Sequence, residues 1–378
     1  MDEDGQQHPI KGIFFVAGSC IGGGTISLPF VTACIGFFPA LFVMLFSWFV
    51  MLLSGLMINK LQESFEEEVN FVTMASEVFG PAGKAVAWVS FLFLFYSLMV
   101  AYFCGLAQFG SLLSLSSETT LLLSFVLACY LFFQGSSVCI LVNAVLVWGL
   151  VLSYFFLMKD LLLHVQVSRI YPMSFSCVYC SIPAMITSFG FQNTIPTLLR
   201  CFPRRVVSIV LLGSVIVFFM YASWLFVVLG SFPLSTILLA RETGMGLALL
   251  GEVVGLGKVS VWGTAFFSFF ALSTSLITQG MSLMDLFANS LSFSREKQRT
   301  LLIVLSLLPP FVFSLFFPSF FFKALGLAGG IFAMVLFGLF PATMVWLRLP
   351  YRRNYAALLA TSSLFVIGCT VAGLYVGM

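Results

Sequence analysis

Eleven apolar segments, each about as long as a membrane-spanning helix, follow one another along the chain. They lie near residues 11–34, 37–59, 84–113, 120–138, 141–159, 177–199, 206–230, 259–287, 300–317, 322–347 and 354–377. An α-helix rises 1.5 Å per residue, so about 20 residues cross a hydrocarbon core about 30 Å thick. The pattern predicts an all-α polytopic membrane protein with eleven transmembrane helices.

The composition agrees with a lipid environment. The 378 residues are 61% hydrophobic and 8% charged, whereas soluble domains are about 45–50% apolar and about 25% charged. The net charge is only +3, and the Lys and Arg residues are scattered over short loops. No basic tract is long enough to follow a phosphate backbone. We therefore expect the lipid bilayer as a partner, and we expect no nucleic acid.

The Lys and Arg residues also indicate an orientation. If the amino terminus is cytoplasmic, the inside segments hold Lys11, Lys60, Lys84, Arg200, Arg204, Arg205, Arg295, Lys297, Arg299, Arg348, Arg352 and Arg353. The outside segments then hold Lys159, Arg169, Arg241, Lys258 and Lys323. Because short cytoplasmic loops collect positive residues, this distribution predicts a cytoplasmic amino terminus and an external carboxyl terminus.

The first apolar segment is interrupted by three consecutive glycines, Gly22–Gly24. Each glycine costs about 1 kcal/mol relative to alanine in a helix, so we expect a break near the middle of the bilayer. Backbone groups left unpaired at that depth must be satisfied by protein, water or a ligand. A half-helix that starts around Gly23 would offer free N–H groups and a positive dipole end to a carboxylate.

The sixth apolar segment contains a similar interruption. Its sequence is Thr187-Ser-Phe-Gly-Phe-Gln-Asn-Thr-Ile-Pro-Thr197. Pro196 removes one helical hydrogen bond and clashes with the carbonyl one turn back, and the polar side chains would be costly in lipid. Carbonyls left free at Cys20 and at Ser188–Gly190 would accept from an ammonium group. The two breaks together therefore predict a site for the backbone of a zwitterionic amino acid.

Spans one and six are corresponding members of two five-span halves, which must have opposite topology because five is odd. Inverted halves with discontinuous helices are typical of secondary transporters. Close helix packing is the alternative explanation for the glycines, but two breaks in matching positions favour a site. The predicted organisation is a cytoplasmic tail (1–10), a first five-helix repeat (11–160), an external linker (161–176), a second repeat (177–347) and an eleventh transmembrane helix (348–378).

The interrupted first span resembles a known motif. Gly18-Ser-Cys-Ile-Gly-Gly-Gly-Thr-Ile-Ser-Leu-Pro29 is similar to the GxxIGxGxxxxP motif of the hydroxy and aromatic amino acid permeases, in the amino acid–polyamine–organocation superfamily. Further segments look like signatures of that family in the same order: Gly36–Phe38, Trp48, Ser54–Met57, Ser188–Phe191, Pro196–Leu198, and Thr274-Ser275 through Leu283–Asp285. The resemblance is closest to tyrosine and tryptophan permeases.

This resemblance implies a LeuT-type fold and secondary active uptake of tyrosine, tryptophan or both across a bacterial cytoplasmic membrane by ion-coupled symport. We expect a monomer without a cofactor. A channel would need a continuous polar stripe or rings of charge, and a membrane enzyme would need a catalytic dyad or metal set at membrane depth. Because neither pattern is present, we do not expect an enzyme, and a channel is the weaker alternative.

The coupling ion is left open by one departure from the family pattern. That pattern places Tyr-His-Gly after Phe-Gly in span six, whereas this chain has Phe191-Gln192-Asn193, and Gln192 cannot titrate. Proton coupling, the favoured reading, would need a titratable group such as Asp285 near the inner end of span eight.

Sodium coupling would need oxygen ligands. Hydroxyls of Thr274 and Ser275 with carbonyls near Gly18 and Ile21 would supply them, as in sodium sites of similar folds.

The side-chain pocket is expected from aromatic and small residues on spans three, six, eight and ten. The resemblance favours Tyr102, on span three, as the residue that closes over the substrate. Its ring would pack on an aromatic side chain, and its hydroxyl would reach a carboxylate. The complete predicted substrate site consists of Cys20, Gly22, Gly23, Gly24, Thr25, Tyr102, Ser188, Phe189, Gly190, Phe191, Gln192 and Ser275.

Overall fold

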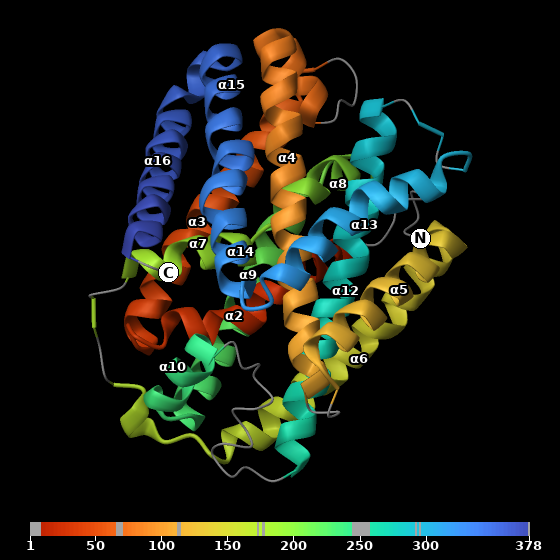
Figure 1. The fold of residues 1–378 in the computed structure, drawn as a ribbon. Coiled ribbons are helices and arrows are strands. Elements are labelled where there is room, and N and C mark those ends of the chain that lie inside the picture. Colours follow the sequence, from red (N-terminus) through yellow and green to blue (C-terminus); the bar gives the residue numbers. More distant parts are fainter. Residues whose placement is uncertain are drawn as a thin grey trace.

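The computed structural model describes residues 9–65, 71–111, 115–171, 174–175, 178–243, 258–291, 293–294 and 296–376, and the regular elements among them are all helical (Figure 1). The α-helices are α1 Pro9–Cys20, α2 Gly23–Thr32, α3 Phe37–Gln62, α4 Phe71–Ser111, α5 Ser117–Gln134, α6 Ser136–Leu162, α7 Val178–Ser188, α8 Ile195–Cys201, α9 Val206–Ser231, α10 Leu234–Thr243, α12 Lys258–Leu291, α13 Arg299–Phe316, α14 Phe321–Leu327, α15 Phe340–Arg348 and α16 Arg353–Val376. Short 3₁₀ turns are η1 Val167–Arg169, η2 Gln192–Thr194 and η5 Pro350–Arg352, and π-helical turns are η3 Ala328–Phe332 and η4 Val335–Leu339.

The predicted polytopic helical fold is confirmed. Within the described part of the chain, nine helical stretches are long and apolar enough to cross a membrane alone, and the bent pair α1–α2 makes a tenth. The remaining predicted span, near residues 177–199, is divided into α7, η2 and α8, and each piece is too short to cross by itself. The count of eleven requires these pieces to form one interrupted span, and it stays a prediction, as do the inverted repeat and the orientation.

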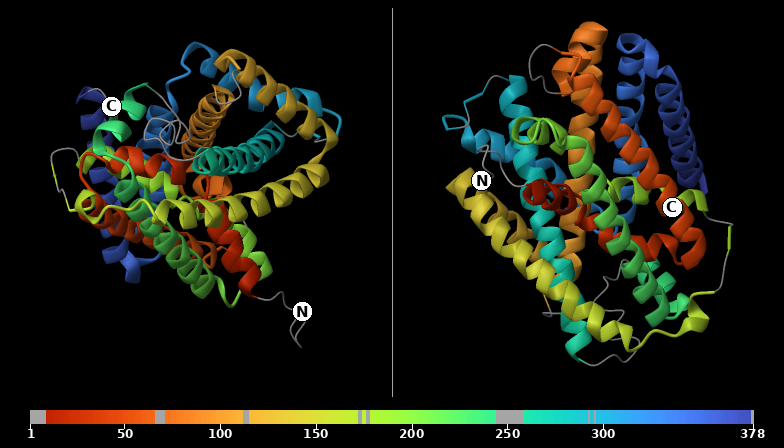
Figure 2. Two further views of the ribbon diagram at one scale, coloured as in Figure 1. Left: turned by 90° about the horizontal axis from the view of Figure 1, so that it is seen from below. Right: turned by 180° about the vertical axis from the view of Figure 1, so that it is seen from behind.

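The helices form a bundle with α4 running through its middle (Figure 1). Figure 2 shows the same bundle from below and from behind, with the consecutive helices α5 and α6 on its outside. Only 22% of the most apolar window of α5 and 17% of that of α6 are buried, against 72% for α4. These two helices therefore present most of their apolar side chains outward, as lipid-facing helices do.

The connection between α3 and α4 leads into the first turns of α4. The first turns of α4 precede a kink at Gly80, whose φ of 68° is a left-handed conformation that glycine adopts without strain. Glu77 in these turns lies 3.5 Å from the Arg348 guanidinium at the end of α15. The acidic residues 66–68 of this connection lie outside the described residues.

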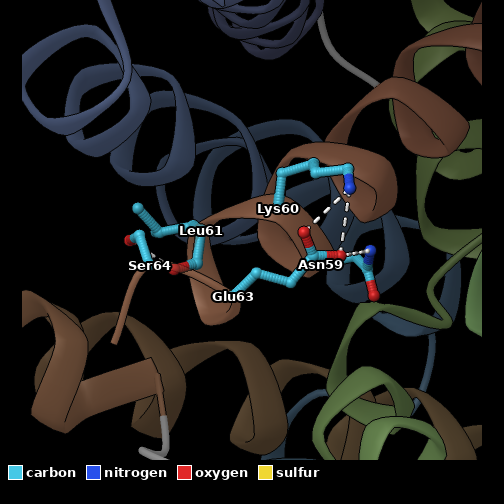
Figure 3. A network of polar contacts seen from close by, with 5 residues as sticks. All are labelled: Asn59, Lys60, Leu61, Glu63 and Ser64. Atoms are coloured by element: carbon cyan, nitrogen blue, oxygen red, sulfur yellow. Dashed lines mark hydrogen bonds and ion pairs between the residues drawn. The ribbon is translucent and has the colours of Figure 1, made fainter. Parts of the chain in front are cut away.

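Polar contacts close the carboxyl-terminal end of α3 (Figure 3). The Lys60 ammonium lies 2.8 Å from one Glu63 carboxylate oxygen, and the Asn59 amide donates to the other at 3.1 Å. The Ser64 hydroxyl donates to the Leu61 carbonyl at 2.6 Å and so occupies one of the last free acceptors of the helix. These contacts are exposed or half-buried, so we assign them to the helix end and not to a binding site.

Span ten contains the two π-helical turns, which are rare and often occur at functional sites. Gly329 lies against Thr187 of α7, and Gly330 lies against Thr370 of α16. The Thr187 hydroxyl also donates to the Leu325 carbonyl at 2.8 Å. Span ten therefore packs closely against α7 and α16 at the first of these turns.

Candidate functional site

The first helix breaks where the glycines predict. α1 ends at Cys20, α2 begins at Gly23, and the two axes differ by 53°. Gly22 is extended between them, and its carbonyl accepts from the Thr25 N–H at 3.0 Å. The first N–H groups of α2 have no carbonyl one turn earlier in their own helix. The break therefore directs a positive helix end into the protein.

The second break lies between α7 and α8. α7 ends at Ser188, Gly190 follows, and η2 connects to α8. The prediction that Pro196 interrupts this span is wrong in detail, because the proline occupies the first turn of α8. Helices tolerate proline there because the first-turn N–H groups have no intrahelical partner. The break itself lies about Gly190.

Each glycine of the first break meets a different helix. An added Cβ at Gly22 would collide with the Ser275 hydroxyl of α12. At Gly23 it would lie 2.7 Å from Cε1 of Tyr102 on α4. At Gly24 it would lie 2.6 Å from the hydroxyl oxygen and 2.9 Å from Cα of Ser188 on α7. Close packing and site formation are thus not alternatives here, because the same glycines bring three helices to the break.

A cavity of about 890 Å³ lies beside the two breaks. Its walls come from α1, α2, α3, α4, α6, α7, η2, α9, α12 and the π-helical part of span ten. Spans three, six, eight and ten are among these elements, and their role as the side-chain pocket stays a prediction. Within the described residues, no Asp, Glu, His, Lys or Arg lines this cavity. A charged ligand would therefore be held by backbone dipoles and neutral polar groups.

The structure brings most, but not all, of the predicted site residues to the cavity. Those that line it are Gly18, Cys20, Ile21, Gly22, Gly23, Gly24, Tyr102, Gly190, Thr274 and Ser275. Those placed elsewhere are Thr25, Ser188, Phe189, Phe191, Gln192 and Asp285. Tyr102 is 5% exposed and contacts the break from α4, as a residue that covers a ligand would.

Span six directs Asn193, not Gln192, toward the cavity. The Gln192 side chain is 2% exposed, and its amide nitrogen donates to the Met51 carbonyl of α3 at 3.0 Å. Phe191 packs beside it against Gly55 of the same helix. Asn193 lines the cavity. The geometry of the break decides which side chain of η2 faces the cavity. The prediction that Gln192 lines the site is therefore wrong in this structure, and Asn193 takes that position.

Two residues of α9 that the sequence argument missed hold the breaks in place. The Tyr221 hydroxyl lies 2.7 Å from the Cys20 carbonyl and 2.9 Å from the Ser188 carbonyl, the last residues of α1 and α7. The Trp224 indole N–H donates to the Thr25 carbonyl at 2.9 Å. Both side chains are fully buried. α9 thus fixes both half-helix ends and the first turn of α2.

Tyr221 occupies acceptors that were expected to bind a substrate ammonium group. Its single hydroxyl hydrogen is shared between two carbonyls, and each carbonyl oxygen has two lone pairs. Acceptor capacity therefore remains at Cys20, which lines the cavity, whereas Ser188 lies behind it. The ends of α1 and α2 together can receive the two charges of a zwitterion, the ammonium at carbonyls and the carboxylate at N–H groups.

The candidate ion-coupling residues fall into two places. Gly18, Ile21, Thr274 and Ser275 line the central cavity. The Thr274 hydroxyl donates to the Phe270 carbonyl of its own helix at 2.9 Å, which leaves its oxygen lone pairs for another partner.

Asp285 lies in a separate small hollow that it shares with Arg299. This places the carboxylate at the junction of α12, α13 and the α5–α6 turn, apart from the breaks.

Comparison with known proteins agrees with this architecture. A tyrosine-specific transport system of Haemophilus influenzae is 28% identical over 88% of this chain and 86% of its own length. A tryptophan-specific transport protein of Shigella flexneri is 25% identical over 85% and 82%. A second tyrosine-specific transport system of H. influenzae is 27% identical over 91% of both chains. The profile of the tryptophan/tyrosine permease family matches residues 6–372, so the chain is an integral membrane protein that belongs to this family of permeases and is not an enzyme.

Proposed function

We propose that this permease takes up tyrosine, tryptophan or both by ion-coupled symport across a bacterial cytoplasmic membrane, with its amino terminus inside. The observation that carries the proposal is the meeting of two interrupted helices at a cavity whose described walls are uncharged. A zwitterionic amino acid matches such a site because the helix ends supply both partial charges. The aromatic and apolar side chains around Tyr102 provide a surface for an aromatic ring.

Uptake into proteoliposomes tests this proposal directly. Purified protein should accumulate labelled tyrosine or tryptophan against a concentration gradient when a pH or sodium gradient is imposed, with saturable kinetics. Protein-free liposomes are the control for leak. If neither gradient concentrates either amino acid, symport of these substrates is wrong. Flux that rises without saturation would instead indicate a channel.

Sodium is a second candidate for the coupling ion, and the placement of residues supports it over the proton. The oxygen-bearing candidates line the cavity beside the α1–α2 break, whereas Asp285 lies in another hollow with Arg299. Hydroxyl and carbonyl oxygens are the ligands that hard cations prefer. A proton taken up at Asp285 would have to influence the cavity through movement of α12.

Thr274→Val removes a hydroxyl while keeping the side-chain volume. In a sodium symporter, we expect this variant to raise the sodium concentration for half-maximal uptake at least about tenfold, because one ion ligand is lost. Asp285→Asn should leave that value unchanged. The measurement is uptake against sodium concentration at fixed pH. Unaltered sodium dependence in Thr274→Val, with loss of pH-driven uptake in Asp285→Asn, would support the proton instead.

A further inference from the structure

Two amide side chains in the cavity wall have an unused acceptor. The side-chain oxygens of Asn143 on α6 and Gln279 on α12 are buried and have no hydrogen-bond donor. Hydroxyls on the same wall differ, because those of Thr274 and Thr278 donate to carbonyls of their own helix. Buried polar atoms are normally paired, so an unpaired one on a side chain that lines a cavity indicates a hydrogen-bond partner that arrives with the ligand.

The two amides belong to facing helices. Gly149 of α6 lies against Phe270 of α12, and Gly263 of α12 lies against Phe156 of α6, so the helices run antiparallel. Asn143 precedes Gly149 by six residues, which places it about 9 Å along α6 from the contact between Gly149 and Phe270. Gln279 follows Phe270 by nine residues, which places it about 14 Å along α12 from the same contact. Because the helices are antiparallel, both displacements have the same direction. The difference is about one helical turn, so both amides flank one level of the cavity.

This level lies at a suitable distance from the backbone site. Ser275 contacts Gly22 at the first break, and Gln279 follows Ser275 by four residues on the same helix. Four residues rise about 6 Å, which is about the reach of a phenol or indole side chain from its own Cα. An aromatic amino acid bound at Gly22–Gly24 with its ring along α12 would bring the polar atom of that ring to Gln279.

We infer that Asn143 and Gln279 are specificity-determining residues that accept a hydrogen bond from the ring of the substrate. The inference rests on the proposed uptake of tyrosine, tryptophan or both and supplies a reason for that selectivity, since both rings carry a donor, a phenol O–H or an indole N–H. Phenylalanine has no such donor and leaves the buried oxygens unpaired. A site that hydrogen-bonds a substrate group discriminates strongly against an analogue that lacks it, because the polar partners of the site stay desolvated and unpaired.

The test compares the kinetics of three substrates in proteoliposomes. Uptake of labelled tryptophan, tyrosine and phenylalanine is measured with the wild-type protein, Gln279→Met and Asn143→Leu. Gln134→Met is the matched control, since it makes the same exchange at an exposed position at the end of α5, outside the cavity wall.

We expect each cavity variant to raise KM for tryptophan or tyrosine about tenfold while KM for phenylalanine is unchanged or falls. Phenylalanine uptake by the same variant also reports that it is folded.

The outcomes separate this inference from the proposed function. If the wild-type protein carries none of the three amino acids, the proposed function fails and the inference fails with it. If the wild type carries them and the variants keep its substrate preference, only the inference is overturned. If Gln279→Met and Asn143→Leu lose uptake of all three amino acids equally, the inference is also overturned. Equal loss would indicate a structural defect, because a lost hydrogen bond to the ring would affect only tryptophan and tyrosine.

Discussion

Replacing Gly24 with alanine is expected to reduce uptake at least about tenfold while the protein still inserts into the membrane. The new Cβ would lie 2.6 Å from the Ser188 hydroxyl oxygen, which can rotate away, but also 2.9 Å from Ser188 Cα, which cannot. The two half-helices must then move apart at the point where both breaks meet. Overpacking of this kind costs about 1–3 kcal/mol, and here it falls on the geometry of the site.

Gly326→Ala is the matched control for this variant. Gly326 is a buried helical glycine in span ten, and no atom lies within 4 Å of an added Cβ. We expect wild-type uptake from it. The measurement is initial uptake rate at equal membrane abundance, determined by quantitative blotting of the membrane fraction. Normal uptake by Gly24→Ala would show that close contact between the two breaks is not required for transport.

The breaks were predictable because their cause is local. Three consecutive glycines weaken a helix whatever surrounds them, and they stand at the α1–α2 bend. The second break was placed correctly in span six, although Pro196 lies in the first turn of α8 and does not interrupt the helix by itself. The long apolar segments predicted the helices because this cause is also local: in lipid, a spanning helix pairs its backbone groups within itself.

The side chains around the breaks were less predictable because packing between distant segments decides their direction. A 3₁₀ turn of three residues turns Asn193 to the cavity and Gln192 to α3, and no local pattern distinguishes these neighbours. Asp285 was chosen because intramembrane charge is rare and often functional. Its place beside Arg299 depends on the packing of α12 on α13, which the spacing of residues does not reveal.

Tyr221 left no recognisable signal in the sequence. It lies on α9, an apolar helix without any break or polar cluster to mark one face. The sequence does not distinguish Tyr221 from the other nine tyrosines of the chain. Its role follows from its position between two helix ends in the folded protein. The functional importance of its hydroxyl is therefore a prediction from the structure alone.

Tyr221→Phe is expected to lower uptake at least about tenfold, because two buried carbonyls lose their donor at a cost of about 1–3 kcal/mol each. The ring remains, with its edge-on contact to Phe189 at 5.3 Å between centroids. The Cys20 and Ser188 carbonyls lie at the negative ends of α1 and α7. Without the shared hydrogen these ends repel each other, so the two breaks separate and the break that binds the amino acid loses its alignment.

Tyr96→Phe separates this effect from a general loss of stability. The Tyr96 hydroxyl donates to the Leu305 carbonyl of α13 at 2.6 Å, and Tyr96 does not line the cavity. Both variants should lower the melting temperature of the purified protein, Tyr221→Phe by more because two buried carbonyls lose their donor and not one, but only Tyr221→Phe should raise KM for the amino acid. If the two variants lose uptake in proportion to their melting temperatures, the Tyr221 hydroxyl acts on stability alone. If KM rises only in Tyr221→Phe, its bridge between the half-helix ends contributes to substrate binding, and α9 belongs to the transport machinery together with the two interrupted spans.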